Sequence, residues 1–405
     1  MVSHRVGRRD SEEGEGYMSN EYDSLGLLID GNGLKAFHSS AGHPDDAMAQ
    51  PLPACRDCSI SDVPIVEILR KTERWHLKRS AFNFEGSVLL GEGSVGTVMK
   101  AKLNGSPVAV KILREDLKSS MQHLKDLIQE VLAASILGNR HPNLVGFYGA
   151  CLDMDDLRVV YELVDGQNLE EILNLKSSTI SQKRWRPPLE LALSWSKQML
   201  SALTFLHHGQ PSIIHRDVKP SNLFLSSNLE VLKLGDFGLC KVLYHEREHI
   251  GARGQMSGNT GSWRYMAPEV FTEQGGYTHC YTTKVDIYSA AVVIWCMCTG
   301  ELPFASMDPH KIALMVCRQG LRPPLHFLKN QRVAKILHRA WSSDPSKRPS
   351  AATMALKLSR VGTGDEDVPM RDEDVSANFH GSWPPQKVWG GGAIPTRVTV
   401  MASRV

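Results

Sequence analysis

Residues 215–222 read HRDVKPSN and bring a histidine, two cations, a carboxylate and an amide into eight positions. Side chains of these types at this density could form the catalytic loop of an enzyme, or the inactive remnant of such a loop. A short polar stretch can equally be a solvated turn. The rest of the chain must decide among these interpretations.

Three glycines nearer the N-terminus indicate phosphate chemistry. Gly91, Gly93 and Gly96 form G-x-G-x-x-G, a weak pattern by itself in a chain with 33 glycines. A dinucleotide-binding fold would continue with a helix, but here the strand pattern TVMKAKL follows, then NGS as a hairpin turn and VAVKIL as a third strand. The glycines are therefore predicted to lie in a strand-turn-strand flap whose backbone amides can approach phosphate oxygens.

Lys111 ends this third strand pattern, where its ammonium group could reach the same phosphates. The run LKDLIQEVLAASIL that follows has the spacing of an amphipathic helix, and Glu130 within it is the carboxylate available to hold Lys111 in place. Each feature alone is common on protein surfaces. At this separation the two together favour a phosphate-binding site.

The composition limits the classes of function. The 405 residues are 42% hydrophobic, enough for a sizeable core, and 46 Lys and Arg against 44 Asp and Glu indicate no nucleic-acid groove. The longest apolar run, AAVVIWCMC at 290–298, is less than half of the ~20 residues of a membrane span. The N-terminus has no signal-peptide pattern, and the eight scattered cysteines suit a reducing compartment. We therefore expect a soluble, intracellular, cytoplasmic protein with no nucleic-acid partner and no membrane span.

The organisation along the chain is uneven. Residues 1–60 are rich in Gly, Ser, Asp and Glu and are expected to be disordered. Residues 61–83 are expected to form a short lead-in helix and linker, with apolar residues at helical spacing, namely Ile65, Ile68, Leu69 and Trp75. The acidic and Gly-rich segment 361–405 is expected to be a disordered tail. All of the chemistry is thus predicted to lie between these flanks.

The order of the motifs resembles that of eukaryotic protein kinases over residues 84–360. After Glu130 come HPNLVGFYGAC, LRVVYELV, HRDVKPSN, DFG at 236–238, APE at 267–269, DIYSAAVVIW and a final Arg-Pro. GSWRYMAPE and GELPF are most similar to the tyrosine-kinase-like (TKL) group of serine/threonine kinases.

The resemblance implies an α+β, bilobal protein kinase fold with ATP in the cleft between the lobes. A small antiparallel β lobe with one helix would cover residues 84–161, and a hinge would follow at 162–166. A larger, mainly helical lobe would cover residues 167–360.

The resemblance also implies roles for the octet. Asp217 would orient the hydroxyl of the substrate and accept its proton, and Lys219 would contact the γ-phosphate. Asn222 and Asp236 would be Mg²⁺ ligands. These roles agree with the chemistry, because phosphoryl transfer needs cations and metal around the developing charge but only one positioned base at the incoming hydroxyl.

The implied ATP site has Lys111, Glu130 and the three glycines at the phosphates. Adenine would bind the backbone of Glu162 and Val164 in the hinge. Tyr161 falls at the family's gatekeeper position, where a bulky ring would restrict the space behind adenine. The side chains expected to wall the adenine ring, which also fit plain core positions, are Leu90, Val98, Ala109 and Phe224.

Lys219 and Ser262 favour serine and threonine over tyrosine as acceptors. In the Ser/Thr pattern that HRDxKPxN resembles, a hydroxyl such as that of Ser262 bridges Asp217 and Lys219. Protein substrates bearing Ser or Thr are therefore the implied partners. A dual-specificity kinase and a pseudokinase that acts as a scaffold remain alternatives. The presence of Lys111, Asp217 and Asp236 together favours an active enzyme.

Other polar residues match buried structural ties of the family. Asp286, Glu269 and Arg348 belong to this set, and the last two are expected to pair, because an unpartnered charge would be costly in the core. His215 is expected to pack against Phe237. These residues would support the site without taking part in the reaction.

Arg216, which precedes Asp217, suggests regulation by phosphorylation. In the family an Arg at this position is a buried cation that commonly pairs with a phosphate on the activation segment, here 236–269. Ser257 and Thr260 are the candidate acceptors, because Ser262 is expected to be engaged with Asp217. An upstream activating kinase would then be a further partner.

Overall fold

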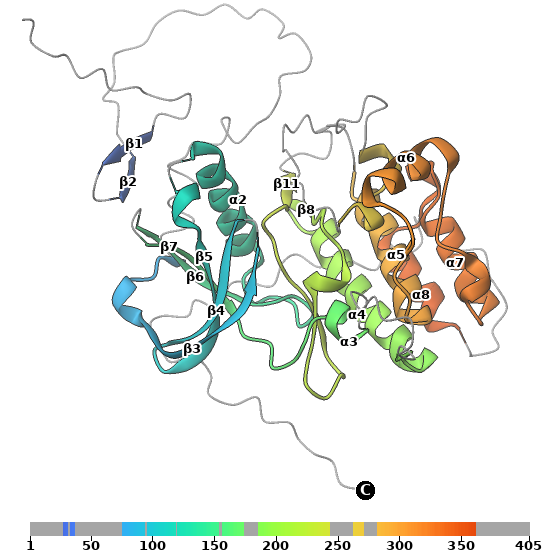
Figure 1. Ribbon diagram of the computed structural model, residues 1–405, viewed down its shortest axis with the longest axis horizontal. Coiled ribbons are helices and arrows are strands. Elements are labelled where there is room, and N and C mark those ends of the chain that lie inside the picture. Colours follow the sequence, from blue (N-terminus) through green and yellow to red (C-terminus); the bar gives the residue numbers. More distant parts are fainter. Residues whose placement is uncertain are drawn as a thin grey trace, which may run out of the picture.

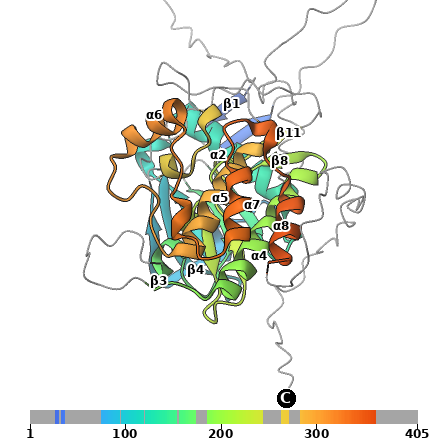
Figure 2. The same ribbon diagram turned by 90° about the vertical axis from the view of Figure 1, so that its right-hand side faces the viewer.

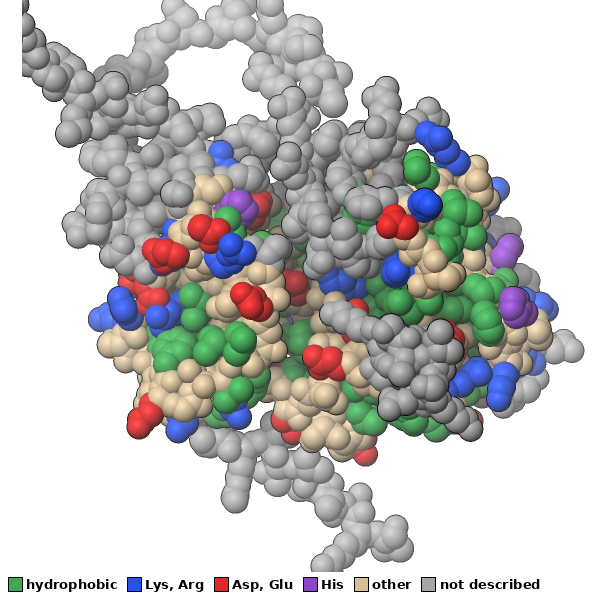
Figure 3. Space-filling view, viewed as in Figure 1, with side chains coloured by type: hydrophobic (Ala, Val, Ile, Leu, Met, Phe, Trp, Pro, Cys, Tyr) green, Lys and Arg blue, Asp and Glu red, His purple; other side chains and the backbone are tan. Residues whose placement is uncertain are grey.

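The structure is a computed structural model that describes residues 27–30, 33–36 and 75–361, with gaps at 94, 119, 154–155, 174–184, 244–261 and 271–281. Figure 1 shows a small lobe built on a sheet and a larger lobe built from helices, so the expected α+β, bilobal architecture is confirmed. Positive and negative side chains are interspersed on the face of the small lobe seen in Figure 3, as the near balance of charges implies.

The small lobe contains a five-stranded antiparallel sheet in the order β3-β4-β5-β7-β6. Strands β4 and β5 are joined at Asn104 and Gly105, whose φ values of 49° and 84° suit a two-residue hairpin turn, as the NGS sequence predicts. The strands are β3 (Phe82–Glu92), β4 (Gly96–Leu103), β5 (Ser106–Leu113), β6 (Phe147–Asp153) and β7 (Asp156–Glu162).

Helix α2 (Met121–Leu137) packs its apolar face on this sheet. Its residues Leu127 and Val131 are buried in the same cluster as Phe147 of β6. Glu130 is a polar residue among them and is only 3% exposed. Because a buried carboxylate is costly without a partner, the position of the helix depends on what Glu130 contacts.

Helix α5 (Lys284–Thr299) is the central helix of the large lobe. Its residues from Val285 to Thr299 are all buried, and Figure 2 shows it among α4, α7 and α8. The apolar run at 290–298 is therefore a core helix. Within the described ranges, no helix combines the length and the apolar character needed to cross a membrane. The other α-helices are α3 (Leu169–Ile172), α4 (Leu189–His208), α6 (Pro309–Gln319), α7 (Gln331–Ala340) and α8 (Ala351–Ser359).

Four short strands hold the loops that carry the polar motifs. The octet 215–222 lies between β8 and β9, and the DFG motif lies between β10 and β11. β9 pairs with β10 and β8 pairs with β11, both antiparallel, so the two loops are held side by side. The strands are β8 (Ser212–Ile214), β9 (Leu223–Leu225), β10 (Leu232–Leu234) and β11 (Lys241–Leu243).

Short 3₁₀ turns complete the described elements. They are η3 (Arg79–Ala81), η4 (Glu115–Leu117), η5 (Pro220–Asn222), η6 (Ser262–Tyr265), η7 (Pro268–Val270), η8 (Leu325–Phe327) and η9 (Pro345–Lys347).

Two short strands lie within the N-terminal segment 1–60, for which disorder is expected. β1 (Leu27–Asp30) and β2 (Gly33–Ala36) pair as antiparallel strands. The sequence Asp-Gly-Asn-Gly at 30–33 is typical of tight hairpins, a local signal that the overall composition hides. The remainder of that segment and the tail after residue 361 lie outside the described residues.

Trp75 attaches the lead-in segment to the small lobe. Its ring centroid lies 5.3 Å from that of Phe147, and the N–H of Leu77 donates to the carbonyl of Ala150 at 2.8 Å. The helix expected around Ile65 lies outside the described residues. Trp75 thus packs against β6 and forms part of the lobe.

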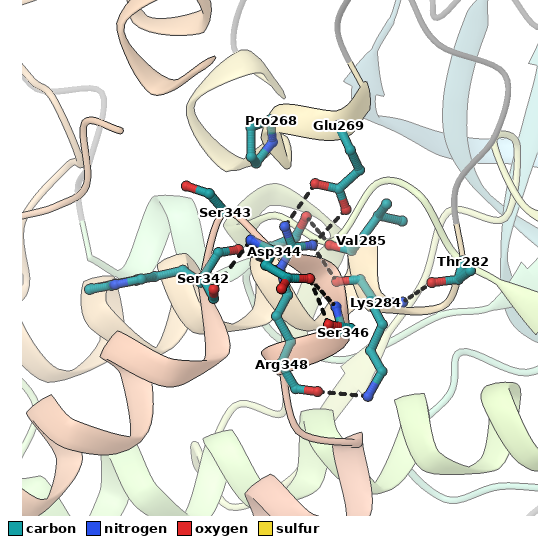
Figure 4. Close-up of polar contacts among 12 residues, drawn as sticks. Pro268, Glu269, Thr282, Lys284, Val285, Ser342, Ser343, Asp344, Ser346 and Arg348 are labelled. Atoms are coloured by element: carbon teal, nitrogen blue, oxygen red, sulfur yellow. Dashed lines mark hydrogen bonds and ion pairs between the residues drawn. The ribbon is translucent and has the colours of Figure 1, made fainter. Parts of the chain in front are cut away.

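A buried ion pair ties the large lobe together (Figure 4). Arg348 is fully buried and donates to both carboxylate oxygens of Glu269, at 2.6 and 2.7 Å. It also donates to the carbonyls of Ser342 and Lys284, at 2.8 and 3.0 Å. The Nζ of Lys284 in turn donates to the carbonyl of Arg348 at 2.7 Å. The structure thus joins the Glu269–Arg348 pair expected from the sequence, across 79 residues.

Candidate active site

The centre of the candidate site is a cluster of three charged residues from the two lobes. Lys111 on β5 donates to both oxygens of Glu130 on α2, at 2.9 and 2.8 Å. Its Nζ also lies 3.5 Å from Oδ1 of Asp236, in the loop after β10. The strand, the helix and the large-lobe loop are therefore linked by one ammonium group.

The charges of this cluster stabilise one another. Burial alone would lower the pKa of Lys111, but the carboxylates of Glu130 and Asp236 outweigh it and hold that pKa above its ordinary value of 10.5. Partial burial would raise the pKa of Asp236, but the charges of Lys111 and Lys219 hold it below its ordinary value of 3.8. Lys111 and Asp236 are therefore both charged at neutral pH.

The octet folds so that its carboxylate is held by its own neighbours. Lys219 Nζ lies 2.7 Å from Oδ2 of Asp217. The side-chain NH₂ of Asn222 donates to that same oxygen and to the carbonyl of Asp217, both at 2.9 Å. The N–H of Gly235 donates to the carbonyl of Asn222 at 2.9 Å, which joins this loop to the DFG loop.

Asp286 at the start of α5 fixes the backbone at the beginning of the octet 215–222. Its oxygens accept from the N–H groups of His215 and Arg216, at 2.9 and 2.8 Å, and contact Nε2 of His207 at 2.8 Å. Burial would raise the pKa of Asp286, but the hydrogen bond and charge of His207 lower it, so Asp286 stays ionised. Arg216 has a φ of 70°, an unusual backbone conformation for a non-glycine residue. The buried carboxylate supports this turn, which directs Asp217 into the site.

The DFG loop packs its phenylalanine inward and leaves its carboxylate accessible. The ring of Phe237 is buried, 5.9 Å from that of His215 and 6.3 Å from that of Tyr161. Asp236 has a φ of 61°, and its side chain remains 44% exposed. The contact expected between His215 and Phe237 is thus present, and Asp236 faces both Lys111 and solvent.

The three glycines of the flap are not equivalent. The N–H of Gly93 donates to the carbonyl of Gly96 at 2.9 Å, which closes the turn. A Cβ atom added to Gly96 would collide with the carbonyl oxygen of Ile112, whereas one added to Gly91 would meet no atom within 4 Å. Only Gly96 is therefore required by the packing of the strands. A Cβ atom added to Gly93 would make only an ordinary contact, 3.6 Å from the carbonyl oxygen of Gly96.

The hinge residue Glu162 has a structural side chain. Its Oε2 accepts from the N–H of Gly146 at 3.0 Å and from Nζ of Lys233 at 2.9 Å. These bonds tie the end of β7 to β10. The carboxylate of Glu162 is therefore committed to contacts within the protein.

The residues expected to surround adenine occupy different environments. Ala109, Val164 and Phe224 pack partly buried against the main core. Val98 lies opposite Lys111 in the β4–β5 ladder. Leu90 on β3 is 46% exposed. The first group packs against the core, whereas Leu90 offers an exposed apolar surface that a ligand could cover.

Two contacts of the site were missed by the sequence interpretation. The hydroxyl of Tyr161 donates to Oε1 of Glu130 at 2.8 Å, and Lys233 pairs with Glu162. The alternation of β7 could have placed Tyr161 on the face toward α2, but no sequence signal connects it to a residue 31 positions earlier. The side chain of Ser262, and Ser257 and Thr260 entirely, lie outside what the structure describes.

Asn222 and Asp236 have the chemistry of magnesium ligands. Because the NH₂ group of Asn222 is committed to Asp217, its carbonyl oxygen is the atom that can serve as a ligand. Together with the exposed carboxylate of Asp236 this makes two oxygen donors, the type that Mg²⁺ prefers. No cluster of three or more His, Cys, Asp or Glu suited to a metal occurs among the described residues, so further ligands would come from phosphate oxygens and water.

A bilobal fold with a Lys–Glu pair in the small lobe, and an Asp-containing loop and a DFG loop in the large one, defines a class of phosphotransfer proteins. The chain belongs to the protein kinase domain family, whose model matches residues 84–358. ATP is the phosphate donor that this family membership implies.

Curated relatives share about a third of the aligned residues. The chain is 31% identical over 300 residues to Serine/threonine-protein kinase VIK of Arabidopsis thaliana, covering 74% of this chain and 64% of that protein. It is 33% identical over 269 residues to Mitogen-activated protein kinase kinase kinase 7 of Bos taurus, covering 65% of this chain and 41% of that protein. These comparisons confirm the predicted resemblance to tyrosine-kinase-like serine/threonine kinases.

A third relative carries another specificity in its name. The chain is 31% identical over 320 residues to Seven transmembrane domain-containing tyrosine-protein kinase 1 of Dictyostelium discoideum, covering 75% of this chain and 43% of that protein. The chain thus spans less than two thirds of the length of each of these three relatives.

Proposed function

We propose that the chain is an ATP- and Mg²⁺-dependent protein serine/threonine kinase, which transfers the γ-phosphate of ATP to Ser or Thr hydroxyls of protein substrates. The observation that carries this proposal is the closed Lys111–Glu130 pair, 2.8 Å long, with Asp236 beside it. A phosphate-binding lysine is useful for transfer only when it is held in place, and both carboxylates hold it here.

The small lobe and the hinge bind the nucleotide in this proposal. The backbone amides of the glycine flap and the ammonium group of Lys111 bind the phosphates, and Glu130 fixes Lys111. Adenine lies against the backbone of Glu162 and Val164, between apolar side chains of both lobes. These apolar side chains are Leu90, Val98, Ala109 and Phe224.

The large lobe orients the acceptor. Asn222 and Asp236 would hold Mg²⁺, which when bound neutralises phosphate charge. Asp217 orients the hydroxyl of the substrate and takes its proton as the new oxygen–phosphorus bond forms and the bond from the γ-phosphorus to the bridging oxygen of ADP breaks. Lys219, 2.7 Å from Asp217, provides positive charge at the transferring group.

Serine and threonine are favoured over tyrosine by Lys219. A lysine two positions after Asp217 is the Ser/Thr pattern, and the names of the plant relatives agree with it. The tyrosine kinase among the relatives keeps dual specificity as the second candidate function. A pseudokinase is less favoured, because Lys111, Asp217 and Asp236 are all present and within a connected set of contacts.

The decisive experiment uses the purified chain with γ-labelled ATP, a generic protein substrate, and either Mg²⁺ or EDTA. We expect Mg²⁺-dependent labelling in which acid hydrolysis yields phosphoserine and phosphothreonine. Phosphotyrosine in comparable amount would establish dual specificity. Nucleotide binding without any transfer would refute the kinase proposal in favour of the scaffold.

We further propose that an upstream kinase activates the enzyme by phosphorylating Ser257 or Thr260. Both lie in the activation segment between Asp236 and Glu269, and Arg216 beside Asp217 is the cation that a phosphate on this segment would contact. A phosphate adds about −1.5 to −2 charge and can form charge-assisted hydrogen bonds with an arginine. Untreated enzyme is expected to turn over faster than phosphatase-treated enzyme and the Ser257→Ala/Thr260→Ala variant. Equal rates for all three would exclude this switch.

A further inference from the structure

Tyr161 lies on the face of the sheet that carries Lys111. In the β5–β7 ladder, Tyr161 is opposite Ala109 and Val159 is opposite Lys111. Side chains two residues apart on a strand point to the same side. Tyr161 and Lys111 therefore both face α2, from neighbouring strands.

The hydroxyl of Tyr161 gives Glu130 a second donor from the sheet. It donates to Oε1 at 2.8 Å, and Lys111 donates to both oxygens at 2.9 and 2.8 Å. Glu130 is 3% exposed and Tyr161 is 9% exposed. A hydrogen bond to a charged acceptor in such a water-poor place is among the stronger ones that proteins make.

The ring of Tyr161 is fixed by aromatic neighbours from both lobes. Its centroid is 5.9 Å from that of Phe147 on β6 and 6.3 Å from that of Phe237 in the DFG loop. With the ring fixed at these distances, the hydroxyl is presented to Glu130 without further loss of side-chain freedom. The contact therefore links α2, the sheet and the DFG loop.

The phenol remains a donor under working conditions. Burial, reinforced by the negative charge of Glu130, raises the pKa of Tyr161 well above its ordinary value of 10.0. The group is therefore protonated at neutral pH and cannot repel the carboxylate.

We propose that Tyr161 is a positioning residue of the kinase reaction, whose hydroxyl holds Glu130 and through it sets Lys111 for the phosphates of ATP. This inference rests on the proposed function. It assigns to Tyr161 a role beyond occupying space behind adenine. The new role depends on the hydrogen bond from its hydroxyl to Glu130, which a phenylalanine of the same shape cannot make. Helix α2 is thus fastened to two adjacent strands.

The test compares Tyr161→Phe, Glu130→Gln and the double variant in the full chain. Tyr161→Phe should lower kcat/KM for ATP by about 3- to 10-fold, as expected for one hydrogen bond to a charged group with another donor still present. In the Glu130→Gln background the same change should cost less than about 2-fold, because the shared acceptor is already weakened. An equal loss in both backgrounds would overturn the proposal.

Tyr288→Phe is the matched control. Tyr288 is buried in the large lobe, and its hydroxyl has no hydrogen-bond partner among the described residues. This variant should leave kcat/KM unchanged. A loss as large as that of Tyr161→Phe would show a general effect of removing a buried hydroxyl and would refute the proposal.

Hydrogen exchange of the α2 amides gives a readout that needs no catalysis. We expect faster exchange in Tyr161→Phe than in the wild type and no change in Tyr288→Phe. Unchanged exchange in Tyr161→Phe would overturn the positioning role. If the wild type transferred no phosphate, the kinase proposal would fail by itself, and the exchange data would still decide whether Tyr161 holds α2.

Discussion

Two clusters among the described residues, in each of which a cation meets carboxylates, differ in how completely the cation is satisfied. In the large lobe, the guanidinium of Arg348 is fully buried and donates to Glu269 and to two backbone carbonyls. Between the lobes, the side chain of Lys111 is 20% exposed, and that of its second carboxylate partner, Asp236, is 44% exposed. The distance from Nζ of Lys111 to Oδ1 of Asp236 is 3.5 Å, longer than its 2.8 Å distance to Glu130.

This difference separates scaffold from site. The guanidinium of Arg348 is fully buried and already bonded through all three of its nitrogens, so it has no capacity for a ligand, and the main effect of the pair is to join segments that are far apart in sequence. A pair with exposed, incompletely used groups can exchange contacts with phosphate or metal at low cost. Between these two clusters, the remaining exposure of Lys111 and Asp236 distinguishes the one that can take a ligand.

The largest expected effect concerns two carboxylates of the candidate active site, Asp217 and Asp236. Asp217→Asn should reduce phosphoryl transfer by about 10² to 10⁴-fold, because an amide cannot accept the proton. ATP binding should be nearly unchanged, since Asp217 contacts the acceptor and not the nucleotide in the proposed mechanism. Asp236→Asn should impair both transfer and Mg²⁺-dependent ATP binding. Single-turnover rates and nucleotide titrations measure the two quantities separately.

Stability provides the control for these two variants. Both should remain folded with at most a modest loss of stability, because asparagine keeps the shape of aspartate, although Asp217 is buried beside Lys219 and ionised Asp236 stabilises the fold. Wild-type turnover in Asp217→Asn would refute the proposed role of Asp217 in the reaction.

Substitutions in the Arg348–Glu269 pair are expected to show the opposite pattern, with the main effect on stability. Arg348→Met leaves the carboxylate of Glu269 without its main partner and should lower the free energy of unfolding by about 3 to 5 kcal/mol. The double variant Arg348→Met/Glu269→Leu should be less destabilised than Arg348→Met, because no unpaired charge remains. Chemical denaturation measures both. Additive losses in the double variant would show that packing, and not charge pairing, decides this cluster.

The pKa of Asp236, in the cluster with Lys111 and Glu130, gives a further test of this comparison. Asp236 has a pKa held below its ordinary 3.8, so its ionised form stabilises the fold above that pH and the contribution is lost as pH falls through the lower folded-state pKa. In Lys111→Met the largest favourable charge is gone, and the titration midpoint of Asp236 should rise. Carbon-13 NMR of the Asp carboxyl groups follows it. A midpoint that did not move would mean that Lys111 does not set this charge.

The smallest expected effect concerns the flanks. A chain of residues 62–362 should melt within a few °C of the full chain and bind ATP equally well, because the removed segments lack a core-forming pattern. Trp75→Ala should cost roughly 2 kcal/mol, less than the 3–5 typical of fully buried aromatic residues, because Trp75 is half-buried against Phe147. Melting of the shorter chain with and without this substitution separates the two contributions. A large loss on truncation alone would show that the flanks stabilise the lobes.

Local patterns were sufficient to predict much of the fold. The alternation of β4 and β5 with Asn104 and Gly105 between them identified a hairpin, and the helical spacing around Glu130 identified α2. The order of the motifs identified the family. These features are legible because each depends on residues close together in the chain.

The sequence interpretation was less informative where composition hid a local signal or where a contact spans the fold. The β1–β2 hairpin was overlooked within a segment of low-complexity character. Lys233 was overlooked because its partner, Glu162, is 71 positions away. A single sequence carries no distance information of that kind.

The amino-acid sequence by itself determined which chemical groups are present, their order and the secondary structure that carries them, because side-chain periodicity and turn preferences act over a few residues. The tertiary structure alone decided that Tyr161 donates to Glu130, that Asp286 supports the turn before Asp217, and that Lys111 faces Asp236 across the lobes. Those contacts depend on how the sheet, α2 and α5 pack together, and packing is a property of the whole folded chain that no short pattern encodes.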